Sequence, residues 1–397
     1  MSVQSAVVLA AGEGVRLRPL TRNRPKPMLP AANRPILEHV LDALVDAGID
    51  HLVVVVGYRR KRVQEHFGST YRGASVEYVV QHKQLGSGHA LLQARDAVDG
   101  SVVVVNGDQI TDAESVTRVR EVFAEETAPA VMAVIERRDA SKYGAVTLRD
   151  RDVDAIVEKP DTDKYRLMNG GIYAFDPTIF EAIDETEPRH GEISLADTID
   201  RIVDRDRVRA VRTDGLWADA TYPWDLLEVS AEVFARGRVA EPERQDGVWV
   251  NNNANVHSDA TLRAPVVVGP DCEISPGAVV GPAVALGQNV TVGANTTIER
   301  TVLDADTRVG AGSTLQDAVV GQNVHLGATS TIPGGPGDVR VEQQIFEQRQ
   351  LGAVVADRVR ARGNVSFAPG TLVGPNTNLG TGTHVSGTID EGTEVMR

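Results

Sequence analysis

The 397-residue chain has little cysteine, lysine or aromatic side chain. Cys272 is the only cysteine, which excludes an intrachain disulfide and a cysteine-based zinc cage. No apolar run approaches the roughly 20 residues needed to cross a bilayer. The amino terminus also lacks the basic segment that opens a secretory signal. These absences predict a cytoplasmic protein with no membrane span.

Positive charge is scarce too, and most of it is arginine. The formal net charge is −14, and no lysine follows Lys164. This balance disfavours binding to nucleic acid or to anionic membranes. Acidic residues are spread along the whole chain, as in proteins from salt-loving organisms. We therefore predict a halophilic protein, although a GC-rich genome would also favour arginine over lysine.

The first part of the chain alternates two kinds of segment, and a chain this long is expected to form two domains. Short β-branched runs predict buried strands at 6–10, 52–56, 76–80 and 101–105. Helical spacing of apolar residues predicts helices at 35–47 and 88–98. We assign 1–235 to a Rossmann-like α/β domain with a mostly parallel sheet. Ligands bind beyond the carboxyl ends of such strands, here after Ala10, Gln81 and Val105.

The second part of the chain has a period of six. Aliphatic residues recur six apart at Val256, Leu262, Val268, Ile274, Val280, Leu286, Val292 and Ile298, and the repeat resumes after a short irregularity. Neither a helix nor a hairpin sheet has this period. It resembles the hexapeptide repeat of left-handed β-helices. We predict a left-handed parallel β-helix over 251–397, a charged linker over 236–250, and Cys272 as an inward-facing filler.

The first predicted strand runs into a glycine loop that is followed by two cations. Glycines let backbone N–H groups close around phosphates, and arginine adds a fork of donors. The stretch LAAGEGVRLRPLTRNRPKPMLP (9–30) resembles the signature of the sugar nucleotidyltransferase family, which includes glucose-1-phosphate thymidylyl- and uridylyltransferases. The resemblance implies catalytic roles for Arg16 and Lys26. It implies a nucleotide-binding loop made by Leu9, Ala10, Ala11, Gly12 and Gly14.

The segment YVVQHKQLGSGHA (78–90) resembles the base-reading part of N-acetylglucosamine-1-phosphate uridylyltransferases. In those proteins a glutamine like Gln81, with backbone groups near Gly86 and Ser87, reads the pyrimidine imide. An amide suits that edge because it offers a donor and an acceptor side by side. The thymidylyl branch usually has a proline in this segment, so UTP is expected ahead of dTTP.

Two carboxylates are candidates for a metal. Asp108 follows the strand in VVVVNGDQI, and Asp219 lies in WADATYPWDLL. In the family the first aspartate holds Mg²⁺ and takes part in catalysis, and a second carboxylate joins it. One or two carboxylates plus phosphates are the ligands that Mg²⁺ prefers. The family normally has glycine where this chain has Thr221, which leaves the orientation of Asp219 open.

Three further stretches, KYGAV, VEKP and MNGGIYAF, resemble family elements that bind the sugar or its phosphate. The implied sugar-phosphate residues are Tyr143, Gly144, Glu158, Lys159, Asn169 and Gly170. A fourth stretch, GEISLAD, also matches the family, but Ser194 is better explained there as a helix N-cap.

The resemblance implies in-line attack of a sugar 1-phosphate on an NTP, with pyrophosphate leaving. In bifunctional relatives the β-helix is also an acetyltransferase. Here Ala311 and Thr314 replace that site's histidine and tyrosine, and His325 is only nearby. We therefore expect a non-acetylating β-helix that assembles the chain into a homo-oligomer, for example a trimer. A bifunctional enzyme with a relocated acetyl site and a non-catalytic regulatory homologue remain the alternatives.

Overall fold

The computed structural model describes residues 3–126, 128–158, 160, 162 and 164–396. These residues form two compact units. The first, unit 1, consists of Met1–Glu13, Pro25–Met28 and Ile36–Ala218. The second, unit 2, consists of Gly14–Arg24, Leu29–Pro35 and Asp219–Arg397.

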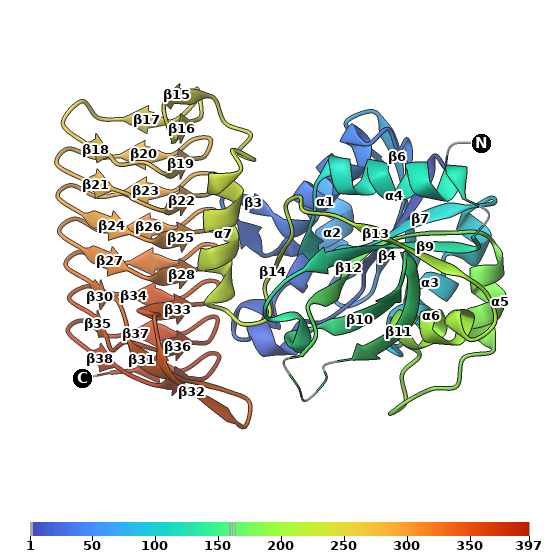
Figure 1. The fold of residues 1–397 in the computed structure, drawn as a ribbon. Coiled ribbons are helices and arrows are strands. Elements are labelled where there is room, and N and C mark those ends of the chain that lie inside the picture. Colours follow the sequence, from blue (N-terminus) through green and yellow to red (C-terminus); the bar gives the residue numbers. More distant parts are fainter. Residues whose placement is uncertain (1–2, 127, 159, 161, 163, 397) are drawn as a thin grey trace. The chain divides into compact units, whose positions relative to one another are not determined.

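Unit 1 is built on one ten-stranded sheet in the order β10-β11-β13-β9-β12-β7-β1-β4-β6-β5 (Figure 1). The strands are β1 (Ser5–Ala10), β4 (His51–Val56), β5 (Thr70–Tyr71), β6 (Ala74–Val80), β7 (Val102–Asn106), β9 (Ala130–Glu136), β10 (Gly144–Arg149), β11 (Asp152–Glu158), β12 (Leu167–Phe175) and β13 (Val208–Arg212). Strands β7, β1, β4 and β6 run parallel, and β12 runs antiparallel to both β7 and β9. The predicted α/β sheet is confirmed.

Helices cover both faces of this sheet. One buried cluster joins the sheet to α1 (Ile36–Asp46), α2 (Arg60–Phe67) and α4 (Ala113–Glu125) through side chains such as Leu41, Val63 and Val119. The other joins it to α3 (Ser87–Leu92), α5 (Thr178–Asp184) and α6 (Leu195–Val203). Because both faces are buried, the parallel strands read as continuous apolar runs rather than alternating ones.

Two predicted elements differ in the structure. The helix predicted over 88–98 is α3, which ends at Leu92, followed by the 3₁₀ turn η4 (Arg95–Ala97). The N–H groups of Gln93, Ala94 and Ala97 bond to carbonyls three residues back, which tightens the chain into 3₁₀ geometry. The strand predicted as buried over 76–80 lies in β6, where Glu77 is exposed because only the two-residue β5 covers that edge.

Unit 2 is a parallel β-helix (Figure 1). Three sheets of short strands run along it, and successive coils place one strand in each sheet. One sheet contains β16 (Val248–Val250), β19 (Val266–Val268), β22 (Val284–Leu286), β25 (Thr301–Leu303), β28 (Ala318–Val320), β33 (Ala353–Val355), β36 (Thr371–Val373) and β39 (Thr388–Ile389). The predicted hexad residues from Val268 to Ile298 are buried inside the prism in a single core.

The strand pairing shows where the hexad repeat is irregular. Val268 pairs with Leu286, but Leu286 pairs with Leu303, so this coil is one residue shorter. Its corner turns at Arg300, which has φ 41°. Later the repeat is interrupted by a hairpin of β31 (Gly337–Val341) and β32 (Gln344–Arg349).

Part of the segment predicted as a linker is regular structure. Within 236–250, Val248–Val250 forms β16, which pairs in parallel with β19 and so continues a β-helix sheet. Val250 lies six residues before Val256, so the hexad period already extends into this strand and the predicted linker ran too far toward the carboxyl end. Also in unit 2, α7 (Asp225–Ala235) contacts β25 and β28 along the same sheet.

Candidate functional site

The glycine loop follows β1 at the point where the order of the sheet reverses. The chain passes from β1 to β4 and β6 on one side and then returns to β7 on the other. Such a switch point leaves a crevice beyond the carboxyl ends of the strands. Leu9, Ala10 and Ala11 lie at that end of β1 and are nearly buried, whereas Gly12 is exposed.

Gly107 brings β7 close to β1 and was given no role by the sequence analysis. Its N–H donates to the Leu9 carbonyl at 2.9 Å. A Cβ at this position would lie 2.9 Å from the Cβ of Ala10 and 2.9 Å from a methyl of Val8. Only glycine therefore fits this position, directly before Asp108. The sequence did carry one signal for Gly107, namely a glycine between a predicted buried strand and an acidic residue.

Lys26 and Asp108 are brought together in unit 1. The Lys26 ammonium lies 2.8 Å from a carboxylate oxygen of Asp108. The lysine side chain is 12% exposed and the aspartate side chain 37%, so the carboxylate still reaches solvent. Within the described ranges, no three His, Cys, Asp or Glu side chains gather as a metal cage. A Mg²⁺ ion held by one or two carboxylates and by phosphates needs no such cage, and the solvent-accessible carboxylate of Asp108 is of the ligand type that Mg²⁺ prefers.

Gln81 and Gly86 are also adjacent. The Gln81 side chain, 5% exposed, donates from Nε2 to the Gly86 carbonyl at 3.0 Å, and Nε2 lies 3.0 Å from His89 Nδ1. These contacts hold the amide group in one orientation at the end of β6. Gln84, which the sequence analysis gave no role, donates to the Ala11 carbonyl at 3.2 Å and so ties this segment to the glycine loop.

Ser87 has a structural contact in the same turn. Its hydroxyl accepts a hydrogen bond from the Leu195 N–H at 2.9 Å. The turn packs closely on the start of α6, since a Cβ at Gly86 would lie 2.4 Å from the Ile193 carbonyl oxygen. The predicted N-cap of α6 is confirmed, because the Ser194 hydroxyl accepts from the Asp197 N–H at 3.0 Å.

The sugar-phosphate candidates lie along neighbouring strands of unit 1. Gly144 and Glu158 are paired across β10 and β11. Asn169, on β12, donates to the Tyr173 hydroxyl at 2.7 Å and accepts from the Gly171 N–H at 3.0 Å. Burial raises the pKa of Tyr173, so its hydroxyl remains protonated. Lys159 lies outside the described residues.

Trp217 connects two of these candidates, although the sequence analysis did not select it. Its indole N–H donates to the Gly170 carbonyl at 3.2 Å. The Tyr143 ring meets the indole edge-on at a centroid distance of 5.0 Å. The Arg137 guanidinium covers the indole at 5.4 Å. The indole thus fixes the ring of Tyr143 and the backbone of Gly170 in relation to each other.

Arg16 and Asp219 belong to unit 2, together with Gly14. Arg16 is exposed, and its guanidinium lies 5.8 Å from the centroid of the Tyr222 ring. The Thr221 hydroxyl donates to Asp219 at 3.0 Å, which gives the unexpected threonine a role in orienting this carboxylate.

Asp225 fixes the backbone that follows Asp219. It accepts from the N–H groups of Thr221 at 2.9 Å and Tyr222 at 2.7 Å. Burial raises the pKa of Asp225 to about 6, although these two hydrogen bonds act in the opposite direction. Two carboxylates therefore fix the turn at Thr221: Asp219 accepts from its hydroxyl and Asp225 from its N–H.

Comparison with known proteins gives two family matches. The nucleotidyl transferase family model matches residues 5–236, and the model of the GMPPB C-terminal domain matches residues 262–389. The UTP–glucose-1-phosphate uridylyltransferase AglF of Haloferax volcanii is 38% identical over 229 residues, which cover 56% of this chain and 93% of AglF. The bifunctional protein GlmU of Methanocaldococcus jannaschii is 35% identical over 227 residues, but the match covers only 53% of GlmU.

Solved structures resemble the same part of the chain. A putative glucose-1-phosphate thymidylyltransferase from Bacillus anthracis has a TM-score of 0.54 at 27% identity, covering 58% of this chain and 94% of that one. A UDP-glucose pyrophosphorylase complexed with UDP-glucose has a TM-score of 0.54 at 23% identity, which speaks for the fold alone. None of the helices in the described ranges has the length and apolar character of a membrane span.

Proposed function

The chain belongs to the nucleotidyl transferase family, and we propose that it transfers the nucleotidyl group of UTP, or less readily of dTTP, to a hexose 1-phosphate. The observation that carries this proposal is the ion pair of Lys26 and Asp108. Lys26 follows the glycine loop in the sequence, and Asp108 follows β7, a strand at the switch point of the sheet. The uridylyltransferase name of AglF supports UTP and glucose 1-phosphate as the first substrates to test.

The proposed reaction needs no protein nucleophile. The sugar phosphate is already an anion, so the difficulty lies in bringing two polyanions together in line. Arg16, Lys26 and Lys159 would neutralise charge on the phosphates, and pyrophosphate would leave from the α-phosphorus. Asp108 and Asp219 are the proposed ligands of Mg²⁺, which would supply further positive charge to the phosphates.

The remaining site residues hold the two substrates. The loop of Leu9, Ala10, Ala11, Gly12 and Gly14 would receive the nucleotide phosphates, and the fixed amide of Gln81 would read the base beside Gly86 and Ser87. The paired strands with Gly144 and Glu158, together with Tyr143, Asn169 and Gly170, would bind the sugar. The Gln81 amide nitrogen is already paired within the protein, so the base would be read by the amide oxygen, and a purine that left this acceptor unpaired would cost roughly 1–3 kcal/mol.

A panel assay tests the reaction class and the nucleotide together. Purified full-length protein is incubated with each of UTP, dTTP, ATP and GTP and with glucose 1-phosphate or N-acetylglucosamine 1-phosphate, and pyrophosphate is measured. We expect fastest release with UTP and loss of release with EDTA. Faster turnover with a purine nucleotide would overturn the base assignment, and no turnover with any pair would favour the regulatory homologue.

We further propose that the β-helix is left-handed, assembles the chain into a homo-oligomer and has no acetyltransferase activity. Ala311 and Thr314 are exposed and cannot act as a general base near neutral pH. His325 is exposed on β29 (His325–Leu326), paired between Arg308 and Arg360.

Two measurements test this part of the proposal. Analytical ultracentrifugation should give a mass above that of one chain. Acetyl-CoA with glucosamine 1-phosphate should release no thiol. Thiol release that is abolished by His325→Ala would establish the bifunctional alternative instead.

A further inference from the structure

Arg24 is a buried charge to which neither the motif nor the proposed chemistry gives a role. It is 1% exposed, although it lies in the signature stretch between Arg16 and Lys26. Its guanidinium donates through Nη1 to a carboxylate oxygen of Asp304 and through Nη2 to Asp357 Oδ1, the second at 3.1 Å. The two aspartates are 9% and 2% exposed. All three residues belong to unit 2.

The β-helix is shaped to hold the two carboxylates. Asp304 directly follows β25, and Asp357 follows β33 after one residue. Asp304 also accepts from the Ala305 N–H at 2.7 Å, and Asp357 from the Gln322 N–H at 3.0 Å. Between these two strands in the sheet, β28 is followed by Gly321, where a Cβ would lie 2.5 Å from Asp357 Oδ1. The coils thus fix both carboxylates through their own backbone.

The charges of the cluster keep Arg24 in its ionised form. Burial lowers the pKa of Arg24, but Asp357 and Asp304 more than offset this effect, and the pKa ends above its ordinary value. Arg24 therefore stays charged. If it left the cluster, two buried carboxylates would lose their cation, and an uncompensated buried charge is strongly destabilising. Arg24 is thus held against the coils.

The segment preceding Arg24 is compact. The Thr21 hydroxyl donates to the Gly14 carbonyl at 2.8 Å, which ties the first residue of the loop to a residue three positions before Arg24. Leu17 and Leu20 are each 1% exposed, and the loop folds into the 3₁₀ turns η1 (Val15–Leu17) and η2 (Leu20–Arg22). Arg16 and Arg24 thus belong to one short, compact segment.

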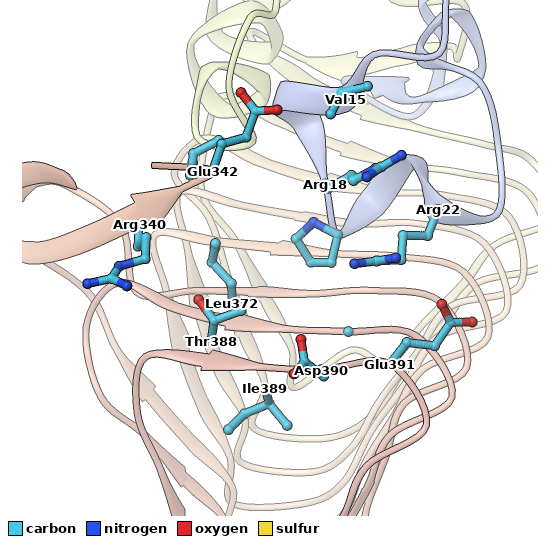
Figure 2. A pocket seen from close by; sticks show the side chains of 13 residues that line it. Val15, Arg18, Arg22, Arg340, Glu342, Leu372, Thr388, Ile389, Asp390 and Glu391 are labelled. Carbon is cyan, nitrogen blue, oxygen red and sulfur yellow. The ribbon is translucent and has the colours of Figure 1, made fainter. Parts of the chain in front are cut away.

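The loop also lies along later coils of the same unit. Arg18 and Arg22 line a cavity of about 220 Å³ with Leu372, Thr388 and Glu391. Figure 2 shows the two arginines on the loop and the other side chains on the coils beside it. The contact with the β-helix therefore extends beyond the ion cluster.

We propose that Arg24, clamped by Asp304 and Asp357, is a positioning residue that builds the Gly14–Arg24 loop onto the β-helix and thereby sets the position of Arg16. The part of this proposal that concerns turnover rests on the proposed function. The β-helix then contributes to nucleotidyl transfer itself, in addition to assembly.

The test compares full-length variants. Arg24→Met combined with Asp304→Asn and Asp357→Asn removes the clamp without leaving a buried charge. Arg24→Lys keeps the charge but loses the fork of donors. The matched control is Arg300→Met with Asp317→Asn, which removes another β-helix ion pair, whose two members both lie outside the Gly14–Arg24 loop. Each variant is measured for thermal midpoint, amide exchange of residues 14–23, and kcat and KM.

We expect the triple variant to keep a midpoint close to that of the control and to lose amide protection in residues 14–23. Its kcat/KM should fall by up to roughly 100-fold, the scale of a small misplacement of a catalytic group. Arg24→Lys should recover part of both losses. Adding Arg16→Ala to the triple variant should lower kcat/KM little further, because both changes remove the same contribution.

Unchanged exchange of residues 14–23 in the triple variant would overturn the proposal, as would full additivity with Arg16→Ala in an active protein. Amide exchange is read without any turnover, so it decides the clamp even if no substrate pair reacts. If the wild type is inactive with every substrate pair but the triple variant still loses amide protection in residues 14–23, the proposed function is refuted and the clamp stands.

Discussion

The two units place functional groups by different physical means. In unit 1, parallel strands of five to seven residues end at one edge, and connectivity alone brings the loops after β1, β6 and β7 to that edge. In the β-helix, strands of two or three residues repeat with the same inward residues, so the regular coils carry no distinctive chemistry. Distinctive groups of the β-helix include Asp304 and Asp357, which follow two strands of one sheet, and the β31–β32 hairpin, which interrupts the repeat.

Removing the charges at the sheet edge of unit 1 should give the largest effect on turnover and so distinguish unit 1 from the β-helix most clearly. Asp108→Asn should lower kcat by about 10²–10³, because a group that stabilises transition-state charge contributes on that scale. Lys26→Ala should act similarly, and neither change touches the core. The measurement is initial rate together with the thermal midpoint. Asp96→Asn, an exposed acid in η4, is the charge-matched control. Near-normal turnover in both site variants would refute a catalytic role for the pair.

The sequence predicted best what is local or periodic. The hexads identified the inward residues of the β-helix because every coil repeats the same environment, and the β-branched runs identified β1, β4 and β7. The clamp could not be predicted, because Arg24 lies 280 residues from Asp304 and 333 from Asp357. One signal was present. Asp304 follows Leu303 where glycine follows Val268, Leu286 and Val320, so a charge stands in the slot of a small residue.

The site was predicted unevenly for the same reason. Lys26 and Asp108 could be found because each lies in a motif, and the structure pairs them. Gln84 and Trp217 could not be found, since their roles depend on backbone carbonyls of Ala11 and Gly170 that reach them only in the folded sheet. The position of Asp219 in relation to Asp108 stays a prediction.

The repeat itself is tested by Leu286→Ala. This side chain is fully buried in the prism, and a large-to-small change in such a core costs about 2–5 kcal/mol. In a stacked repeat each coil contacts its neighbours, so the loss of amide protection should centre on β19 and β25. Glu273→Ala, at an exposed position of β20 (Glu273–Ile274), should change little. Equal loss across unit 1 would show that the two units unfold as one.

A pair of glycine substitutions compares packing with access in unit 1. Gly107→Ala places a methyl 2.9 Å from Ala10 and should destabilise the protein by about 1–3 kcal/mol through overpacking. At Gly12 a Cβ would meet nothing within 4 Å, so Gly12→Ala should leave the thermal midpoint nearly unchanged and raise KM for the nucleotide. Denaturant midpoints and steady-state kinetics check both. A stable Gly107→Ala would contradict the close approach of β7 to β1.

The smallest effect concerns the one cysteine, which reports on the β-helix alone. Burial raises the pKa of the Cys272 thiol to about 11, and the thiol donates to the Gly287 carbonyl at 3.0 Å. Because the folded-state pKa is the higher one, the thiol's contribution to stability is complete below the unfolded pKa near 9 and is lost as the pH rises through about 11. Cys272→Ala should remove that alkaline dependence while costing only about 1 kcal/mol near neutral pH. Denaturant midpoints from pH 7 to 11 measure it, with the rate of native thiol labelling as a second readout. Rapid labelling at pH 8 would place the thiol outside the prism and contradict the inward filler role.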